Sequence, residues 1–96
     1  MRTIKLMADY DCFPLWEASP GVVGNIDPAS LPISKALKAD LMTWAESYNE
    51  TLNRDDPAKS GFNIKEAEDQ FKLQGKALSE RLQAELGSGH LIKIKV

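Results

Sequence analysis

Hydrophobic and polar positions alternate at the two ends of the chain, and this period of two predicts half-buried β-strands. In residues 3–10, TIKLMADY, one side is apolar and the other is mixed. Residues 91–96, LIKIKV, repeat the pattern with Ile92, Ile94 and Val96 on one side. Neither segment is stable as an isolated strand, so we expect the first to pair with the last.

Between these ends, residues 18–33 (ASPGVVGNIDPASLPI) contain turn signals in place of a period. Pro20-Gly21 and Asp27-Pro28 are turn-forming pairs. Apolar residues nevertheless recur through the segment. We therefore expect an ordered loop, with a short strand at residues 13–16 or 22–23.

A period of 3.6 follows the loop and predicts a first helix. Ser34 suits the N-cap because its hydroxyl can accept a hydrogen bond from a free amide of the first turn. Asn53 and the Asp-Asp-Pro at residues 55–57 end the pattern. The apolar stripe consists of Leu37, Leu41, Trp44, Ala45, Tyr48 and Leu52.

A second helix is predicted after residue 62. Asn63 and Glu66 have the spacing of a capping box, with Phe62 just before the cap. Gly87 is suited to the left-handed C-terminal cap. The stripe of this helix consists of Ile64, Ala67, Phe71, Leu78, Leu82 and Leu86, with Gly75 on the same face.

Together these elements predict one α+β domain over residues 1–96, in the order strand, loop, helix, helix, strand. Two antiparallel helices would return the chain to the end where it left the loop. We therefore expect the last strand to run antiparallel to the first. The predicted sheet is small and antiparallel, has a third short strand as an option, and is covered on one face by the helix pair.

The composition is that of an ordinary globular protein, with 43% apolar and 27% charged residues. No apolar run is long enough to cross a membrane, and the N-terminus lacks the features of a signal peptide. Cys12 is the single cysteine, so an internal disulfide is excluded and the cytoplasm is expected. With one histidine, His90, the chain cannot build a closed structural zinc site. We expect no cofactor and no metal.

Charge is unevenly distributed along the chain. Residues 1–56 hold five basic and nine acidic residues, a balance of −4, and residues 57–96 hold seven and five, a balance of +2. Nucleic-acid binders usually have a basic face and a high pI, whereas the pI of this chain is about 5.3. The acidic first half favours a basic protein partner over nucleic acid.

Carboxylates gather at two places. Asp9, Asp11 and Glu17 follow the first strand, and Asp55 and Asp56 lie between the helices. Paired carboxylates support acid–base chemistry or bind hard cations, but the spacing of a calcium loop is absent. The alternative is structural: these aspartates form turns and cap loop amides.

Cys12 raises the alternative of a small enzyme. A nucleophilic cysteine needs a base, and His90 is the only histidine. If the outer strands are antiparallel, the ends that carry Cys12 and His90 are neighbours. A constellation of Cys12, His90 and Asp11 then becomes geometrically feasible, although free cysteine is commonly a small buried hydrophobe.

Apolar residues are also expected on the sheet face that the helices leave uncovered. Met7 and Leu91 belong to this face, mixed with lysines. Two interpretations remain open for Phe13, Leu15 and Trp16. They contribute to an exposed surface that binds a protein, or they complete the core as a third strand.

Three stretches carry a resemblance to a known family: LMADYDCFPLW, GNIDPASLPIS and LMTWAESYNETLNRDDPAKSGF. They resemble a family of small bacterial proteins with the patterns MADY-x-C-x-PLW, GNIDP-x-x-LP and LN-x-DDP-x-x-SGF. The resemblance covers residues 6–62. It implies an immunity-type protein, which neutralises a toxin exchanged between competing bacteria, and it carries over no catalytic residue.

The leading hypothesis is therefore a cytoplasmic bacterial protein that binds and neutralises a toxin. It would cover a basic toxin surface with a set of carboxylates around aromatic residues: Asp9, Asp11, Glu17, Asp55 and Asp56, with Phe13 and Trp16. The alternatives are the small enzyme that uses Cys12 and His90, and a homodimer formed through the open sheet face or an edge strand. The oligomeric state is left open.

Overall fold

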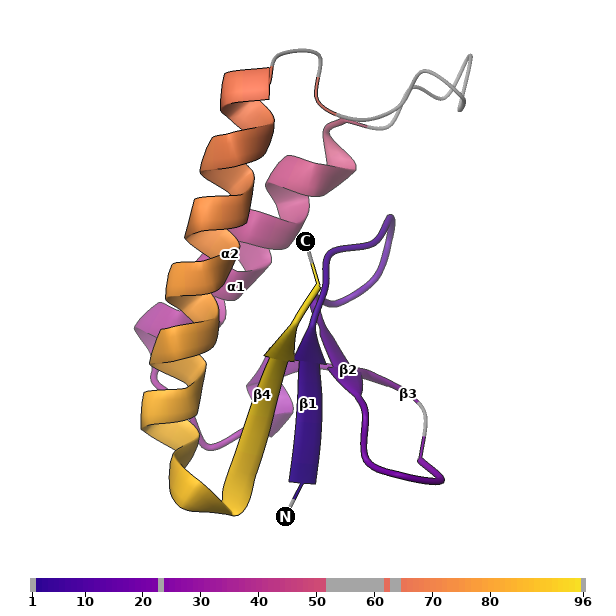
Figure 1. The fold of residues 1–96 in the computed structure, drawn as a ribbon, viewed down its shortest axis with the longest axis vertical. Coiled ribbons are helices and arrows are strands. Elements are labelled where there is room, and N and C mark those ends of the chain that lie inside the picture. The colour runs from indigo at the N-terminus through magenta and orange to yellow at the C-terminus, as the bar shows by residue number, and fades with distance from the viewer. Residues whose placement is uncertain (1, 23, 52–61, 63–64, 96) are drawn as a thin grey trace.

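The computed structural model describes residues 2–22, 24–51, 62 and 65–95, which form four strands and two α-helices (Figure 1). The strands are β1 (Arg2–Leu6), β2 (Leu15–Glu17), β3 (Gly24–Ile26) and β4 (His90–Ile94). The helices are α1 (Lys35–Asn49) and α2 (Lys65–Leu86), with 3₁₀ turns at Pro28–Ser30 and Gly87–Gly89. The predicted α+β class and the order strand, loop, helix, helix, strand are confirmed.

The sheet is mixed, with the order β3-β2-β1-β4. β2 runs antiparallel to both β1 and β3. β4 runs parallel to β1, so that His90 lies opposite Arg2 and Ile94 lies opposite Leu6. The prediction of an antiparallel sheet with antiparallel outer strands is therefore wrong.

The parallel pairing follows from the place where α1 begins. Ser34, just before α1, donates its amide to Glu85 Oε1 at 2.6 Å, so α1 starts beside the end of α2. The last turn of α1 lies at the opposite end, where Tyr10 stacks on Tyr48. Residues 7–34 have thus carried the chain back to the end of the sheet where β1 begins. α1 consequently runs along β1, α2 returns, and β4 repeats the direction of β1.

β1 is shorter than the strand predicted at residues 3–10. It ends at Leu6, and residues 7–14 form a loop that leads into β2. Ala8 continues the alternation because it packs against the core from this loop. The optional third strand exists as β2, which overlaps the expected residues 13–16 at Leu15 and Trp16, and a further strand, β3, follows residues 22–23.

The helix boundaries follow local rules. Ser34 Oγ accepts a hydrogen bond from the amide of Leu37, as predicted for an N-cap. α1 ends at Asn49, earlier than the stripe suggested. Gly87 follows α2 with φ of 76°, the left-handed conformation expected of a C-terminal cap. Ala67 was assigned to the buried stripe of α2, which is wrong because it is exposed. Leu52, Asn63 and Ile64 lie outside the described residues.

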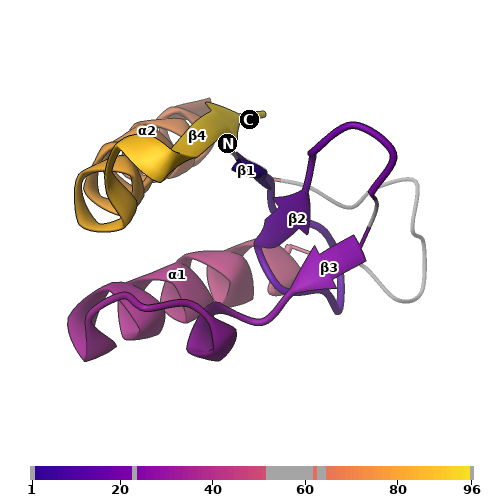
Figure 2. The same ribbon diagram turned by 90° about the horizontal axis from the view of Figure 1, so that it is seen from below.

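The core lies between one face of the sheet and the helix pair. Figure 2 shows both helices on the same side of the sheet, with α2 beside β4 and α1 to the left of β3 and below β2. Each fully buried leucine or isoleucine contributes about 1.5–3 kcal/mol to stability. The residues with no exposed surface are Ile4, Leu6, Leu15, Leu37, Leu41 and Leu82.

An aromatic stack joins the two helices at mid-length. The rings of Trp44 and Phe71 are nearly parallel, with centroids 4.4 Å apart. The indole Nε1 of Trp44 donates to the carbonyl oxygen of Phe71 at 3.0 Å. Tyr48 and Phe62 extend the cluster towards the end of α1. The stack therefore packs α1 against α2, and the buried indole nitrogen has a hydrogen-bond partner.

Candidate binding surface

The loop between β1 and β2 is fixed to the last turn of α1. The rings of Tyr10 and Tyr48 stack with centroids 4.7 Å apart. The hydroxyl groups of Tyr10 and Thr51 share a hydrogen bond of 3.2 Å, and the amide of Asp11 donates to Asn49 Oδ1 at 2.9 Å. Three contacts from consecutive loop residues and the helix end hold the loop in one position.

Asp11 adopts a conformation that helps the loop to turn. Its φ is 57°, which is the left-handed region. Aspartate occupies this region more readily than most side chains. Asp9 Oδ1 accepts a hydrogen bond from the amide of Tyr10 at 2.8 Å. Both aspartates are exposed, so the turn presents two carboxylates to solvent.

Asn25 of β3 holds the second half of the loop. Its Oδ1 accepts from the amide of Phe13 at 2.8 Å. Its Nδ2 donates to the carbonyl oxygens of Phe13 and Leu15 at 2.7 and 2.9 Å. The indole Nε1 of Trp16 donates to the carbonyl oxygen of Met7 at 2.9 Å. The loop is therefore preorganised from both sides.

Four exposed carboxylates lie on this loop and at the end of α1, and we call them the acidic rim: Asp9, Asp11, Glu46 and Glu50. Glu46, Asn49 and Glu50 share one face of α1 because they are three and four residues apart, and Asn49 contacts Asp11. None of the four forms an ion pair with another described residue. No basic residue lies in the last turn of α1.

The acidic rim is unfavourable for the free protein. The C-terminal end of a helix carries a partial negative charge, so cations stabilise it and carboxylates destabilise it. Glu46 and Glu50 are also a like-charged pair one turn apart. Burial, then the neighbouring Tyr10 and, last, the negative Asp9 raise the pKa of the nearby Tyr48 hydroxyl.

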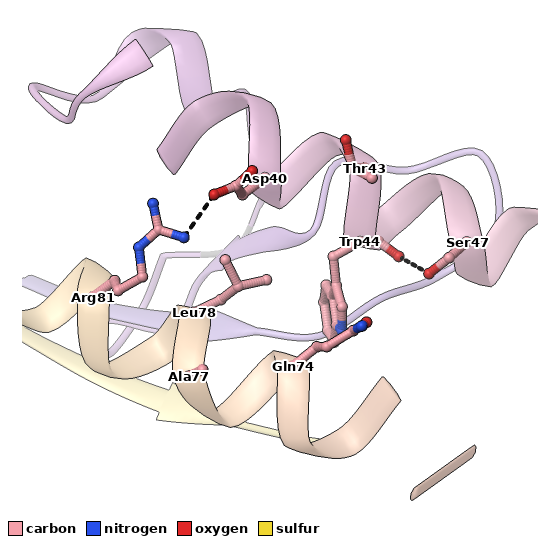
Figure 3. Close-up of a pocket in the computed structure, with 8 residues that line it drawn as sticks. All are labelled: Asp40, Thr43, Trp44, Ser47, Gln74, Ala77, Leu78 and Arg81. Carbon is pink, nitrogen blue, oxygen red and sulfur yellow. Dashed lines mark hydrogen bonds and ion pairs between the residues drawn. The ribbon is translucent and has the colours of Figure 1, made fainter. Parts of the chain in front are cut away.

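A groove of ≈ 440 Å³ runs between α1 and α2. Figure 3 shows the residues that line it, which come from both helices; Trp44 and Leu78 point into the space between them. Trp44 and Leu78 form its buried floor. The ion pair between Asp40 Oδ2 and Arg81 Nη1, at 2.7 Å, closes one end. The other lining residues are Thr43, Ser47, Gln74 and Ala77.

The groove and the acidic rim are neighbours on α1. A shallow hollow of ≈ 430 Å³ beside the groove is lined by Met42, Glu46 and Glu50. Thr43 and Ser47 line both the hollow and the groove. Met42 is 41% exposed. A continuous band thus crosses α1 from the loop, over the rim, to the groove.

The helix-free sheet face presents a different surface. Leu15 is fully buried towards the helices, so Trp16 points to the other face and is half-buried there. Lys5 lies directly opposite both Trp16 and Lys93 in the register of the sheet. Leu91 is exposed on the same face, as predicted. Leu15 therefore completes the core as part of a third strand, whereas Trp16 faces outward beside lysines.

Glu17 does not join Asp9 and Asp11. It lies opposite Ile4 in the sheet, and its Oε2 accepts from Arg2 Nε at 2.9 Å. The hydroxyl of Ser19 donates to Glu17 Oε1 at 2.8 Å. This bond, followed by the Arg2 contacts, lowers the pKa of Glu17. Phe13 lies in the loop and is half-buried, whereas Asp55 and Asp56 lie outside the described residues.

Asp27 shapes the turn predicted at Asp27-Pro28. Its Oδ1 accepts a hydrogen bond from the amide of Ala29 at 2.9 Å. This contact caps the 3₁₀ turn at Pro28–Ser30. The carboxylate of Asp27 therefore shapes the loop before α1 through this hydrogen bond.

The structure does not bring Cys12 and His90 together. His90 lies opposite Arg2, at the start of β1. Cys12 lies in the loop beyond the far end of β1, and the strand itself spans about 13 Å. The adjacency expected of them depended on antiparallel outer strands, and that premise is wrong. Asp11 lies on the side of Cys12, bound to Asn49 through its amide.

In the described part of the chain, no three His, Cys, Asp or Glu side chains lie close enough to hold a metal ion. Neither α1 nor the described length of α2 is sufficiently apolar and long to cross a lipid bilayer.

Comparison with known proteins identifies the family of this chain. No curated protein matches the chain. Residues 2–93 match the sequence model of a family described as Serratia CdiI immunity protein-like. The match includes both helices and all four described strands except the last residue of β4, so that the loop, the acidic rim and the groove all lie within it. This chain belongs to the Serratia CdiI immunity protein-like family.

Proposed function

We propose that this protein binds a toxin protein and neutralises it by covering a basic surface of the toxin with the acidic rim. Membership of an immunity-protein family supports the class of function. The observation that carries the choice of surface is the set of carboxylates at the end of α1, which the free protein leaves without an ion pair among its described residues.

The physical argument is one of complementarity. A carboxylate and a cation 4 Å apart attract by about 1 kcal/mol in water and more where water is excluded. Four carboxylates at the negative end of a helix therefore attract a basic partner strongly. Such charge mainly raises the association rate and selects the partner. The attraction grows on binding because the partner's cations relieve the repulsion within the rim.

Neutralisation requires no chemistry from this chain. A rigid surface that covers the toxin's substrate-binding groups excludes the substrate, and preorganisation lowers the entropy cost of that contact. The loop contacts of Tyr10, Asp11 and Asn25 supply the rigidity. The same proposal places the protein in the cytoplasm, where its single cysteine needs no oxidising partner.

Phe13 and Trp16 take a secondary place in this proposal. Phe13 lies in the same loop as Asp9 and Asp11, so it contributes apolar contact at the edge of the rim. Trp16 faces the helix-free side of the sheet beside Lys5, which is a poor match for a basic partner. We therefore expect Trp16→Ala to weaken toxin binding less than removal of the rim charges.

The experiment tests the product of the gene that neighbours this protein's gene as the candidate toxin. Wild type should bind it in isothermal titration calorimetry and protect its target from it. We expect Glu46→Lys with Glu50→Lys to weaken binding by 100-fold or more at low salt, on the order of 3 kcal/mol, and the difference should shrink at high salt.

The matched control is Asp69→Lys with Glu80→Lys. Both positions are exposed on α2, and the pair changes the net charge by the same amount. This control should bind almost as tightly as wild type. Equal losses in the two double variants would show that only overall charge matters, and the rim would then be abandoned as the binding surface.

A further inference from the structure

We infer that the groove between α1 and α2 receives one large apolar side chain of the toxin, so that the acidic rim and the groove act as one binding surface. This inference rests on the proposed function and names the apolar anchor of the same contact. Trp44 and Leu78 in this groove belong to the apolar stripes that the sequence predicts for the two helices.

The first step is the shape of the groove. Its floor is formed by the buried Trp44 and Leu78, and its walls include the small side chains of Ser47 and Ala77. Because these wall side chains are small, the groove of ≈ 440 Å³ stays open to solvent above its apolar floor (Figure 3). Binding hot spots have this form: an aromatic or aliphatic anchor fills a pocket surrounded by polar contacts.

The second step is the state of the polar groups. The indole Nε1 of Trp44 donates to Phe71, and the hydroxyl of Ser47 donates to the carbonyl oxygen of Trp44 at 2.6 Å. Asp40 and Arg81 bind each other. These polar groups are already paired inside the protein. An occupant therefore gains more by burying apolar surface than by hydrogen bonding, which favours an apolar side chain.

The third step is the charge around the groove. Thr43 and Ser47 separate it from the hollow that holds Glu46 and Glu50. An apolar residue that enters the groove brings its neighbours over this acidic strip, so its own protein must be basic at that point. Met42 and Leu73, which are 41% and 60% exposed, supply additional apolar area on the two helices.

The experiment fills the groove without touching the rim. Ala77→Arg places a long side chain in the groove, at an exposed position of α2 where arginine is a good helix former. Ala84→Arg is the matched control, because Ala84 is exposed on the same helix and does not line the groove. Gln74→Arg provides a second, independent block.

We expect Ala77→Arg and Gln74→Arg to weaken toxin binding about tenfold or more, as loss of an anchor does, while Ala84→Arg binds like wild type. A second readout is direct. In a Trp16→Phe background Trp44 is the only tryptophan, and its emission should shift when the toxin binds. Thermal melts show whether Ala77→Arg or Gln74→Arg fails to fold. In that case the other of these two variants and the Trp44 emission test the inference.

The outcomes separate the two proposals. No binding by wild type would defeat the proposed function. Tight binding by wild type and by both groove-filling variants, with unchanged Trp44 emission, would defeat only the groove. A wild-type dimer in light scattering that Ala77→Arg converts to monomer would assign the groove to a second copy of this chain, and would also overturn the inference.

Discussion

Asn25 shows how a single polar side chain fixes a surface some distance from its own strand. It makes three hydrogen bonds to the backbone of Phe13 and Leu15. The side-chain amide of Asn25 therefore takes the place of backbone hydrogen bonds between β3 and the loop at Phe13. Without these bonds the loop would keep its contacts with α1 but lose its support on the side of β3.

We predict that Asn25→Ala lowers the free energy of unfolding by about 1–3 kcal/mol, because partners are left without hydrogen bonds. Asn25→Asp should be at least as destabilising, since it places a carboxylate against the carbonyl oxygens of Phe13 and Leu15. Urea denaturation measures both. A stability of Asn25→Asp close to wild type would mean that the donor bonds contribute little.

Asp11 combines a backbone role with a charge, and substitutions separate the two. Asp11→Gly removes the charge and keeps the left-handed conformation accessible, so stability should stay close to wild type while toxin binding weakens. Asp11→Val should lose about 1 kcal/mol or more in addition, because β-branched residues are strained at φ of 57°. Equal thermal stability of the two variants would contradict this account.

The ends of the helices are joined by Glu85, and this contact should appear in the pH dependence of stability. Glu85 accepts hydrogen bonds from the amide and the hydroxyl of Ser34 at 2.6 and 2.9 Å. These bonds, with a smaller effect from Arg81, lower the pKa of Glu85 from its ordinary value of 4.5. The N-cap of α1 is thereby tied to the last turn of α2.

The folded state holds the proton of the Glu85 carboxyl group less tightly than the unfolded state does. The stability that these hydrogen bonds contribute is therefore complete above about pH 5.5. It is lost as the pH falls below 4.5 through the folded pKa. Glu17 acts in the same direction. We predict that Glu85→Gln lowers stability at pH 7 and flattens its fall between about pH 5 and 3. Chemical denaturation across this range measures it, and an unchanged slope in Glu85→Gln would refute it.

β4 is an edge strand, and Gln83 of α2 covers part of its free edge. Gln83 Oε1 accepts from the amide of Ile92 at 3.1 Å, and Nε2 donates to the carbonyl oxygen of His90 at 2.7 Å. One amide side chain thus satisfies two backbone groups that would otherwise be available to another strand. Exposed edges of this kind promote pairing between chains.

We predict that Gln83→Ala lowers the free energy of unfolding by about 1–3 kcal/mol and produces dimers or larger species that increase with concentration. Gln70→Ala, at an exposed glutamine of the same helix, should do neither. Light scattering over a concentration series measures the association. A strictly monomeric Gln83→Ala variant would show that α2 protects the edge of β4 without the Gln83 side chain.

For the molecule as a whole, the acidic rim predicts a conflict between stability and binding. Glu46→Lys and Glu50→Lys replace carboxylates at the negative end of α1 with cations and remove a like-charged pair. We predict that each raises the free energy of unfolding of the isolated protein by about 0.5 kcal/mol, although both weaken toxin binding. A loss of stability in both would show that the rim serves the fold and is not held for a partner.

Local sequence signals determined the elements that depend on near neighbours. Ser34 and Gly87 marked helix ends correctly because caps are made within one turn. The stripes through Leu37, Leu41 and Leu82 identified buried positions, since a helix buries one face whatever its partner is. The α+β class and the family resemblance likewise came from residues close together in the chain.

Only the tertiary structure decided how these elements are oriented. No local pattern records that residues 7–34 return the chain to the start of β1, so the direction of β4 was predicted wrongly, and with it the adjacency of Cys12 and His90. The same holds for the binding surface. No sequence signal selects Glu46 and Glu50. Only the contact between Asp11 and Asn49 shows that the loop lies against their part of α1. Orientation and clustering depend on contacts between residues far apart in the chain, and such contacts leave no periodicity in the sequence.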